Sequence, residues 1–324
     1  MTIHPALSIE SGAAVAEGSR TDHHPAMLKT ASRYVPPLAA LFVLGPIAAF
    51  FVNLLRASDG SRDATLLVGA SPVVGVMVLL AVFAIAGSAA LLATHFHGWR
   101  SGMWTAGLTF AHAAWASGPV DMVIRREASP GALTAFAVEG LLVGVLSAAL
   151  AAGVWLVAVR RYARSHDPHE APDAAPRRPH PKNELLRAVM APGALVGIGV
   201  AVVVGGAVAW LVAQEPLKGQ AVFAAIFAGI VGAGFGRLAS SYIDDAANSL
   251  TFFVALAALA LIAPIVARFV HGDELVADLY AGRYFGAAAP VGLDWAAGGF
   301  LGIPIGVSWF ASLFERRRQA RTSA

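Results

Sequence analysis

The fold is decided by residues 160–187, which read RRYARSHDPHEAPDAAPRRPHPKNELLR. This stretch holds seven Lys or Arg residues, four acidic residues and five prolines. Proline ends helices, and a charged, proline-rich segment cannot bury a core, so we interpret the stretch as a solvated linker. Long apolar segments lie on both sides of it. The linker therefore divides the chain into two halves, and its positive charge sets the orientation of each half in a membrane.

The composition places the chain among membrane proteins. Of its 324 residues, 57% are hydrophobic and 13% charged, and the mean hydropathy is +0.66. A soluble domain carries about 45–50% apolar and about 25% charged residues. The net charge of +3 is concentrated in loops, which suits membrane orientation better than nucleic-acid binding. The chain has no cysteine, which excludes disulfides, thiolate metal sites and cysteine nucleophiles.

Eight apolar segments, most of them near the roughly 20 residues that cross a bilayer as a helix, follow a polar start. They are Val35–Leu55, a run within Ala70–Thr94, Ser101–Gly118, Ala132–Val159, Ala188–Ala213, Gly219–Leu238, Leu250–Val270 and Val291–Phe314. The third is short and relatively polar, so whether it fully spans is left open. The fold class we predict is an all-α polytopic membrane helix bundle of about eight transmembrane helices in two four-helix halves.

These segments give the following division of the chain. Residues 1–34 form a disordered cytoplasmic tail, 35–159 the first membrane half, 160–187 the linker, 188–314 the second membrane half, and 315–324 a basic cytoplasmic tail.

Positive charge in short loops predicts the topology. The linker and the tail at 315–324 are the most basic pieces, so we place both in the cytoplasm, and the even number of crossings places the N-terminus there too. Arg125 and Arg126 conflict with this assignment, because the loop Pro119–Pro130 would then lie outside.

The two halves show signs of an internal repeat. Gly107–Phe110 resembles Ser249–Phe252, and the fourth and eighth segments end in similar basic caps at 160–164 and 317–321. Small residues recur every four positions in both of these segments, which allows helix backbones to approach closely in lipid. The helix-packing residues are Gly140, Gly144 and Ala148 in the fourth segment and Gly298, Gly302 and Gly306 in the eighth. Chance similarity between Ala/Gly-rich helices is the alternative to duplication.

Two ionisable residues lie deep in apolar segments, His112 and Glu139. Counted from a turn near Arg125, they fall at similar depth in an antiparallel hairpin, so they are candidates for a pair. Intramembrane ionisable groups are costly and mark functional sites. Three interpretations stay open: a satisfied polar clamp between helices, a transport or proton-relay site, and a haem or metal site. The matching positions of the second half are apolar, so such a site would belong to the first half alone.

Four other polar features have a simpler interpretation. His95 and His97 end the second segment and read as interfacial side chains. Asp244 and Asp245 precede the seventh segment, and either Asp245 or Asn248 would cap its helix, although a cation site is the alternative. Two further features lie near the eighth segment: Asp294 suits a helix N-terminus, and residues 274–285 predict a short amphipathic helix on the outer surface.

The sequence contains no phosphate-binding glycine-rich loop and no hydrolase or metalloprotease motif. We therefore expect no enzyme activity, no catalytic residue, no cofactor and no metal site. Two functions compete: a non-catalytic membrane subunit or scaffold, and a small-solute or proton- or ion-coupled transporter that uses His112 and Glu139. The expected partners are the lipid bilayer and a membrane protein or a second copy of the chain, without nucleic acid. The expected location is a bacterial cytoplasmic (inner) membrane, with both termini in the cytoplasm.

Overall fold

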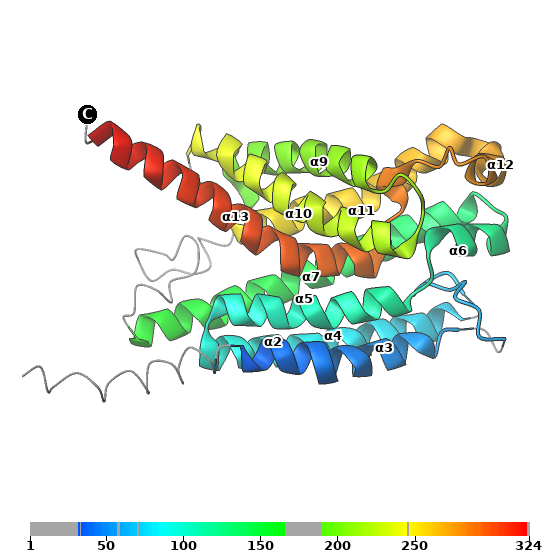
Figure 1. Cartoon of the computed structure of the whole chain (residues 1–324), viewed down its shortest axis with the longest axis horizontal. Coiled ribbons are helices and arrows are strands. Elements are labelled where there is room, and N and C mark those ends of the chain that lie inside the picture. Colours follow the sequence, from blue (N-terminus) through cyan, green and yellow to red (C-terminus); the bar gives the residue numbers. More distant parts are fainter. Residues whose placement is uncertain are drawn as a thin grey trace, which may run out of the picture.

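The computed structural model describes residues 32, 34–56, 59–69, 71–165, 189–244 and 246–322. These residues form an elongated bundle of helices that run roughly along one long axis, and none of them is in a strand (Figure 1). The short helices α6 (Val120–Glu127) and α12 (Leu275–Tyr280) lie together at one end, which we call the α12 end. The opposite end, where α4 turns into α5 at Gly98, is the Gly98 end.

Eight helical passes connect the two ends in the described residues. In the first half they are α2, η1 and α3 (Val35–Ala39, Ala40–Leu44 and Gly45–Asn53, one pass with a π-helical turn in its middle), α4 (Pro72–His97), α5 (Trp99–Ala116) and α7 (Gly131–Ser165). In the second half they are α9 (Pro192–Val212), α10 (Lys218–Ser241), α11 (Ser249–His271) and α13 (Gly292–Thr322). The 3-10 turns η3 (Gly272–Glu274) and η4 (Gly286–Ala288) flank α12. This confirms the predicted all-α membrane bundle.

Six stretches of the described residues are long and apolar enough to cross a membrane. They are Val35–Asn53, Pro72–His97, Gly131–Tyr162, Pro192–Val212, Lys218–Ser241 and Ser249–Tyr280. The two passes outside this set, α5 and α13, lie in the interior: α5 buries 12 of its 18 residues, and every residue of α13 from 292 to 304 is buried. Helices shielded from lipid by other helices need not be strongly apolar. The short third segment is therefore an interior pass about 27 Å long.

The helices of the two halves pack against each other rather than forming separate bundles. α5 of the first half packs on α13, and α11 of the second half packs on α7. Aromatic rings join the two halves at the centre, where Phe300 of α13 stacks on Phe110 at a centroid distance of 5.4 Å and touches Phe253 at 4.8 Å. Phe110 and Phe300 are both fully buried.

Glycines allow close backbone contacts both within the second half and between the halves. A Cβ atom at Gly306 would lie 2.1 Å from the carbonyl oxygen of Ile230 in α10, and one at Gly140 would lie 2.3 Å from that of Ala260 in α11. Three other stripe residues face the same two helices: Gly144 meets Ala257 of α11, and Gly298 and Gly302 meet Ala225 and Ile226 of α10. Ala148 is half-buried against the hydrophobic core. The two stripes thus pack on α11 and α10, and backbone contact replaces side-chain packing there.

The helices before the linker and before the C-terminal tail extend further than the sequence predicts, into residues 160–165 and 315–322. α7 continues through Arg160 to Ser165, since the first proline comes only at Pro168, and the backbone of α13 continues to Thr322. Residues 166–188, most of the N-terminal tail, residues 57, 58 and 70, the last two residues and Asp245 lie outside the described residues.

Candidate functional site

Glu139 lies in the third turn of α7, with only 1% of the residue exposed. Its Oε2 atom accepts two hydrogen bonds, from the Thr65 hydroxyl at 2.7 Å and from the backbone N–H of Leu67 at 3.0 Å. Both donors belong to the loop between α3 and α4. A carboxyl group in such a place is costly unless its oxygens are bonded, so this loop stabilises Glu139 in the interior.

The same loop is held in place from two sides at the α12 end. The backbone N–H of Gly118, after α5, donates to the carbonyl oxygen of Ala64 at 2.9 Å. Arg126 of α6 forms an ion pair with Asp63 at 3.0 Å. The arginine that conflicts with the positive-charge rule therefore has a structural partner, which anchors the loop that carries Thr65.

A buried ion pair lies beside this loop. The ammonium group of Lys218, at the start of α10, is 2.7 Å from Oδ1 and 3.0 Å from Oδ2 of Asp294, and it also donates to the Ser117 hydroxyl at 2.9 Å. Asp294 is fully buried, and its Oδ2 also accepts the backbone N–H of Val291 at 2.9 Å. The prediction that Asp294 sits in the first turn of the eighth helix is thus confirmed, and the carboxylate has a second role as the partner of Lys218.

The first turn of α13 lies between Glu139 and the ion pair of Lys218 with Asp294. A Cβ atom at Gly292 would lie 3.2 Å from Oε1 of Glu139 and 2.9 Å from a methyl carbon of Val143, so only glycine fits there without displacing a neighbour. Lys218 and Asp294 are near enough to act electrostatically on Glu139. We call Thr65, Ser117, Glu139, Lys218 and Asp294 the Glu139 cluster; its members come from both halves of the chain.

One oxygen of the Glu139 cluster is left without a partner. Oε1 of Glu139 is buried and accepts no hydrogen bond from any described residue. Lys218 and Asp294 neutralise each other, so Glu139 is the additional acid of the cluster. The carboxyl group of Glu139 can hold a proton or attract a cation. It can also serve as a structural link between α7 and the loop between α3 and α4.

The structure does not bring His112 and Glu139 together. Nδ1 of His112 lies 3.0 Å from the carbonyl oxygen of Leu108, one turn earlier in α5. The imidazole packs against Gly45 of α3, where an added Cβ would lie 2.4 Å from Nδ1. Similar depth does not make two residues partners when their helix faces differ, and His112 faces α3 whereas Glu139 faces the loop between α3 and α4.

The sequence does not single out Lys218, Thr65 or Ser117, and it indicates only a helix-dipole role for Asp294. Lys218 directly precedes an apolar segment and reads as an interfacial lysine. Thr65 lies in a loop, where no periodicity shows that the chain folds inward. The expectation that the site belongs to the first half alone also fails for this cluster, because Lys218 and Asp294 come from the second half.

The remaining candidates have structural partners. The side chain of Asn248 accepts the backbone N–H of Leu250 at 2.9 Å, and the Thr251 hydroxyl accepts that of Asn248, so Asn248 caps α11 as predicted. Asp244 accepts the backbone N–H of Gly193 at 3.2 Å, at the start of α9. The carbonyl oxygen of His95 accepts a hydrogen bond from Arg161. Within the described parts of the chain, no group of three or more potential metal ligands comes together.

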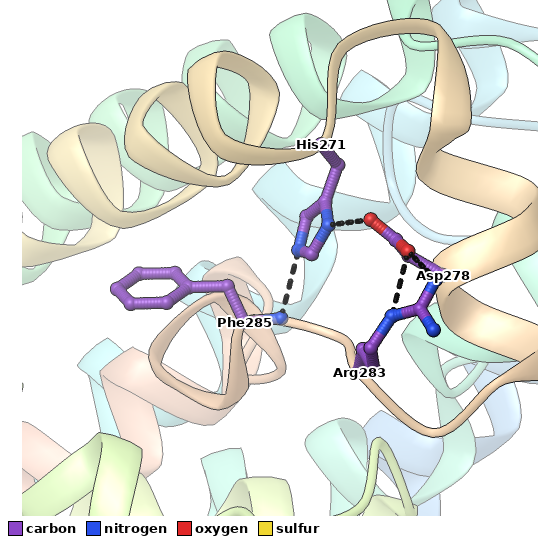
Figure 2. Close-up of polar contacts among 4 residues, drawn as sticks. All are labelled: His271, Asp278, Arg283 and Phe285. Atoms are coloured by element: carbon purple, nitrogen blue, oxygen red, sulfur yellow. Dashed lines mark hydrogen bonds and ion pairs between the residues drawn. The ribbon is translucent and has the colours of Figure 1, made fainter.

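A second polar network fixes the segment that caps the α12 end. His271, the last residue of α11, is 2.9 Å from Oδ2 of Asp278 through Nδ1, and its Nε2 accepts the backbone N–H of Phe285 at 3.0 Å (Figure 2). Arg283 binds the other oxygen of Asp278 at 2.6 Å. Because Nε2 is an acceptor here, the ring carries its proton on Nδ1, which donates to the carboxylate. α12 confirms the short helix that the sequence predicts in this segment.

Tyr284 completes this network. Its ring stacks on His271 at a centroid distance of 5.6 Å, and its hydroxyl donates to the carbonyl oxygen of Ala288 at 3.2 Å. Burial raises the pKa of the Tyr284 phenol, because the charged phenolate would be desolvated. The phenol therefore remains a hydrogen-bond donor at any physiological pH.

Comparison of the chain with protein-family models, with curated proteins and with solved structures gave no match. The class of protein therefore rests on the fold and the site. The chain is an all-α membrane helix bundle, in which lipid-facing helices enclose two interior helices and a buried polar cluster.

Proposed function

We propose that the protein is a non-catalytic membrane subunit or scaffold. The observation that carries this proposal is the contact between helix backbones on both sides of the bundle. At Gly306 and Gly140 the facing carbonyl oxygen occupies the space of a Cβ atom, so α13 cannot slide along α10, nor α7 along α11, without separating. Such packing suits a rigid frame that presents its surfaces to a partner.

Two small cavities between the helices support the same function. Each has a volume of about 10 Å³, which is about the room one water molecule needs. One is lined by Trp99, Met103, Trp155 and Leu250, among others, and the second by Gly229, Gly232, Phe252 and Ile303, among others. Under this proposal the Glu139 cluster is a clamp that fixes the α3–α4 loop and the starts of α10 and α13.

The proposal includes the location and the orientation. The membrane is a bacterial cytoplasmic membrane, and both termini are cytoplasmic. Supporting this, the two most basic stretches of the sequence, residues 160–187 and 315–324, begin in the last turns of α7 and α13, and both of these helices end at the Gly98 end. Positive residues favour the cytoplasmic side.

A second function is supported by one specific observation, the unpartnered Oε1 of Glu139. In a proton- or cation-coupled transporter this oxygen would be the atom that receives the ion, at a junction of helices from both halves. Transport requires that water reach Glu139 in some state of the protein, whereas a scaffold keeps it dry.

Cysteine accessibility separates the two functions, because the chain has no cysteine of its own. Single variants Ser117→Cys and Val143→Cys place a thiol beside Lys218 and beside Gly292, and both positions are buried. Glu127→Cys and Glu274→Cys are exposed controls at the α12 end. The variants are treated with a membrane-impermeant thiol reagent in intact cells and in inside-out vesicles.

The scaffold predicts that the controls react from one side and the two interior thiols from neither. Rapid labelling of either interior thiol would reveal a water path to the Glu139 cluster. It would overturn the scaffold in favour of transport. The side on which the controls react also tests the orientation.

A further inference from the structure

His271 joins three segments at the α12 end through its two ring nitrogens. Nδ1 donates to Oδ2 of Asp278 in α12 at 2.9 Å, and Nε2 accepts the backbone N–H of Phe285 at 3.0 Å (Figure 2). Only 2% of the His271 side chain is exposed. The ring thus links α11 to α12 and to the turn that enters η4, and each link uses a nitrogen in a different role.

The turn that Nε2 holds leads directly to the start of α13. Phe285 precedes η4, which is buried, and residues 289–291 then connect η4 to the first turn of α13. There the backbone N–H of Val291 binds Asp294, a member of the Glu139 cluster. A change at His271 therefore acts on the segment that positions one side of that cluster.

The charges nearest to His271 come from α12 and the turn after it. Arg283 binds the other oxygen of Asp278 at 2.6 Å, which favours the ionised form of this carboxylate. A proton added between pH 8 and pH 5 therefore goes to the imidazole, since histidine is the side chain that titrates in this range. On the opposite side, η4 and α9 carry no charged side chain.

The elements around His271 carry six further charged or titratable groups. They are Arg268 of α11, which donates to Thr134 of α7; Arg125 of α6, which lies over the Tyr280 ring; Tyr284, which stacks on His271; the exposed Asp273 and Glu274 of η3; and Asp294 of α13, which is paired with Lys218.

Protonation changes the two bonds of His271 in opposite ways. A second proton on the ring occupies Nε2, which then has an N–H of its own and can no longer accept that of Phe285. Two donors would face each other in a buried place, and a buried donor without an acceptor is costly. At Nδ1, the hydrogen bond to Asp278 becomes charge-assisted at both ends and is strengthened.

We propose that His271 is a pH-sensitive switch: the neutral ring binds both Asp278 and Phe285, whereas the protonated ring binds Asp278 alone. Acid then releases the turn at Phe285 while α12 stays attached to α11. Gly282, with a φ of 68° and nothing within 4 Å of its Cβ position, lets the backbone rotate between the two. In the proposed orientation the α12 end is not cytoplasmic, so the switch responds to acid outside the cytoplasm. It serves a scaffold and a transporter alike.

Hydrogen exchange of the purified full-length chain in detergent tests the switch. Exchange is measured by mass spectrometry at about pH 8 and about pH 5, with rates corrected for the intrinsic effect of pH on amide exchange. We expect residues 285–289 to exchange at least about tenfold faster in acid, whereas residues 275–280 of α12 should change by less than about twofold. Equal acceleration of both segments, or none in either, would overturn the proposal.

Three variants assign the effect to His271. His271→Gln keeps an oxygen that can accept the N–H of Phe285 and does not titrate, so its exchange should not depend on pH. Asp278→Asn removes the carboxylate that stabilises the protonated ring, so acceleration should begin at a lower pH than in the parent chain. His95→Gln, an exposed histidine at the Gly98 end, is the control and should behave as the parent chain does.

The outcomes of these variants are separable. A pH dependence that survives in His271→Gln, or that disappears in His95→Gln, would assign the titration to another group and disprove the switch. If His271→Gln does not fold, Asp278→Asn still decides, because acceleration over the same pH range as in the parent chain would show that the pair with Asp278 is not involved.

Discussion

At the scale of single residues, Gly306 offers the sharpest test of the packing between α13 and α10. In Gly306→Ala the new methyl carbon would meet the carbonyl oxygen of Ile230 at 2.1 Å, so the two helices must separate. We expect a loss of about 1–3 kcal/mol in the free energy of unfolding, measured by denaturant or thermal melts in detergent. Gly199→Ala is the matched control, because a Cβ at that glycine of α9 meets nothing within 4 Å. Equal effects of the two changes would contradict the packing.

The ion pair between Lys218 and Asp294 gives a second prediction at this scale. Lys218→Met leaves a buried carboxylate uncompensated, so it should cost about 3–5 kcal/mol of unfolding free energy. The double variant Lys218→Met/Asp294→Asn should recover most of this loss, because it removes both charges and keeps an oxygen for the N–H of Val291. Asp121→Asn weakens a 4.0 Å pair with the exposed Arg125 at the surface and should cost less than about 1 kcal/mol. A double variant no more stable than Lys218→Met would argue against a pair.

The sequence reveals Glu139 as a candidate site residue, but it does not reveal that Thr65, Lys218 and Asp294 surround it. A carboxylate within a long apolar segment is conspicuous because the membrane penalises it. Lys218 and Asp294 lie where apolar segments begin, and there a charge normally reaches water or a helix end. The loop that brings Thr65 inward is stabilised by Arg126 and Asp63, a contact between residues far apart in sequence. Periodicity carries no information about such contacts.

At the scale of elements, His271 determines how firmly α12 and its flanking turns cover the end of the bundle. His271→Phe keeps a ring against Tyr284 but loses the hydrogen bonds to Asp278 and Phe285. We expect amide hydrogen exchange in residues 275–288 to accelerate by at least about tenfold, since each of the two lost hydrogen bonds contributes about 1 kcal/mol. Asp273→Asn, an exposed neighbour, is the control. Unchanged exchange in His271→Phe would show that the hydrogen bonds of His271 do not hold α12 in place.

Hydropathy predicts the elements well where they face lipid and poorly where they face other helices. α5 contains Thr105, Thr109 and His112, which is why it is less apolar than the surrounding passes. The threonine hydroxyls donate to backbone carbonyl oxygens one turn earlier, so these polar groups are satisfied within α5. The third segment seemed weak as a membrane span because it is an interior helix.

At the scale of the whole molecule, the two halves depend on each other. α5 packs on α13 and α11 packs on α7, while Phe110, Phe253 and Phe300 form one aromatic core across the junction. The Glu139 cluster also takes members from both halves. A half on its own would expose its share of this core, including a buried acid without its partners, to lipid or to water.

This dependence predicts the behaviour of a divided chain. If residues 1–175 and 176–324 are expressed as two separate polypeptides, we expect them to co-purify in detergent as a one-to-one complex. Each fragment expressed alone should be degraded or should aggregate, because it lacks the helices that cover its interior face. Gly306→Leu should weaken co-purification little, since Gly306 and its neighbour Ile230 lie within the second half, whereas Gly140→Leu, on the α7–α11 contact, should abolish it. Two fragments that are each stable alone and do not associate would show that the halves are independent bundles.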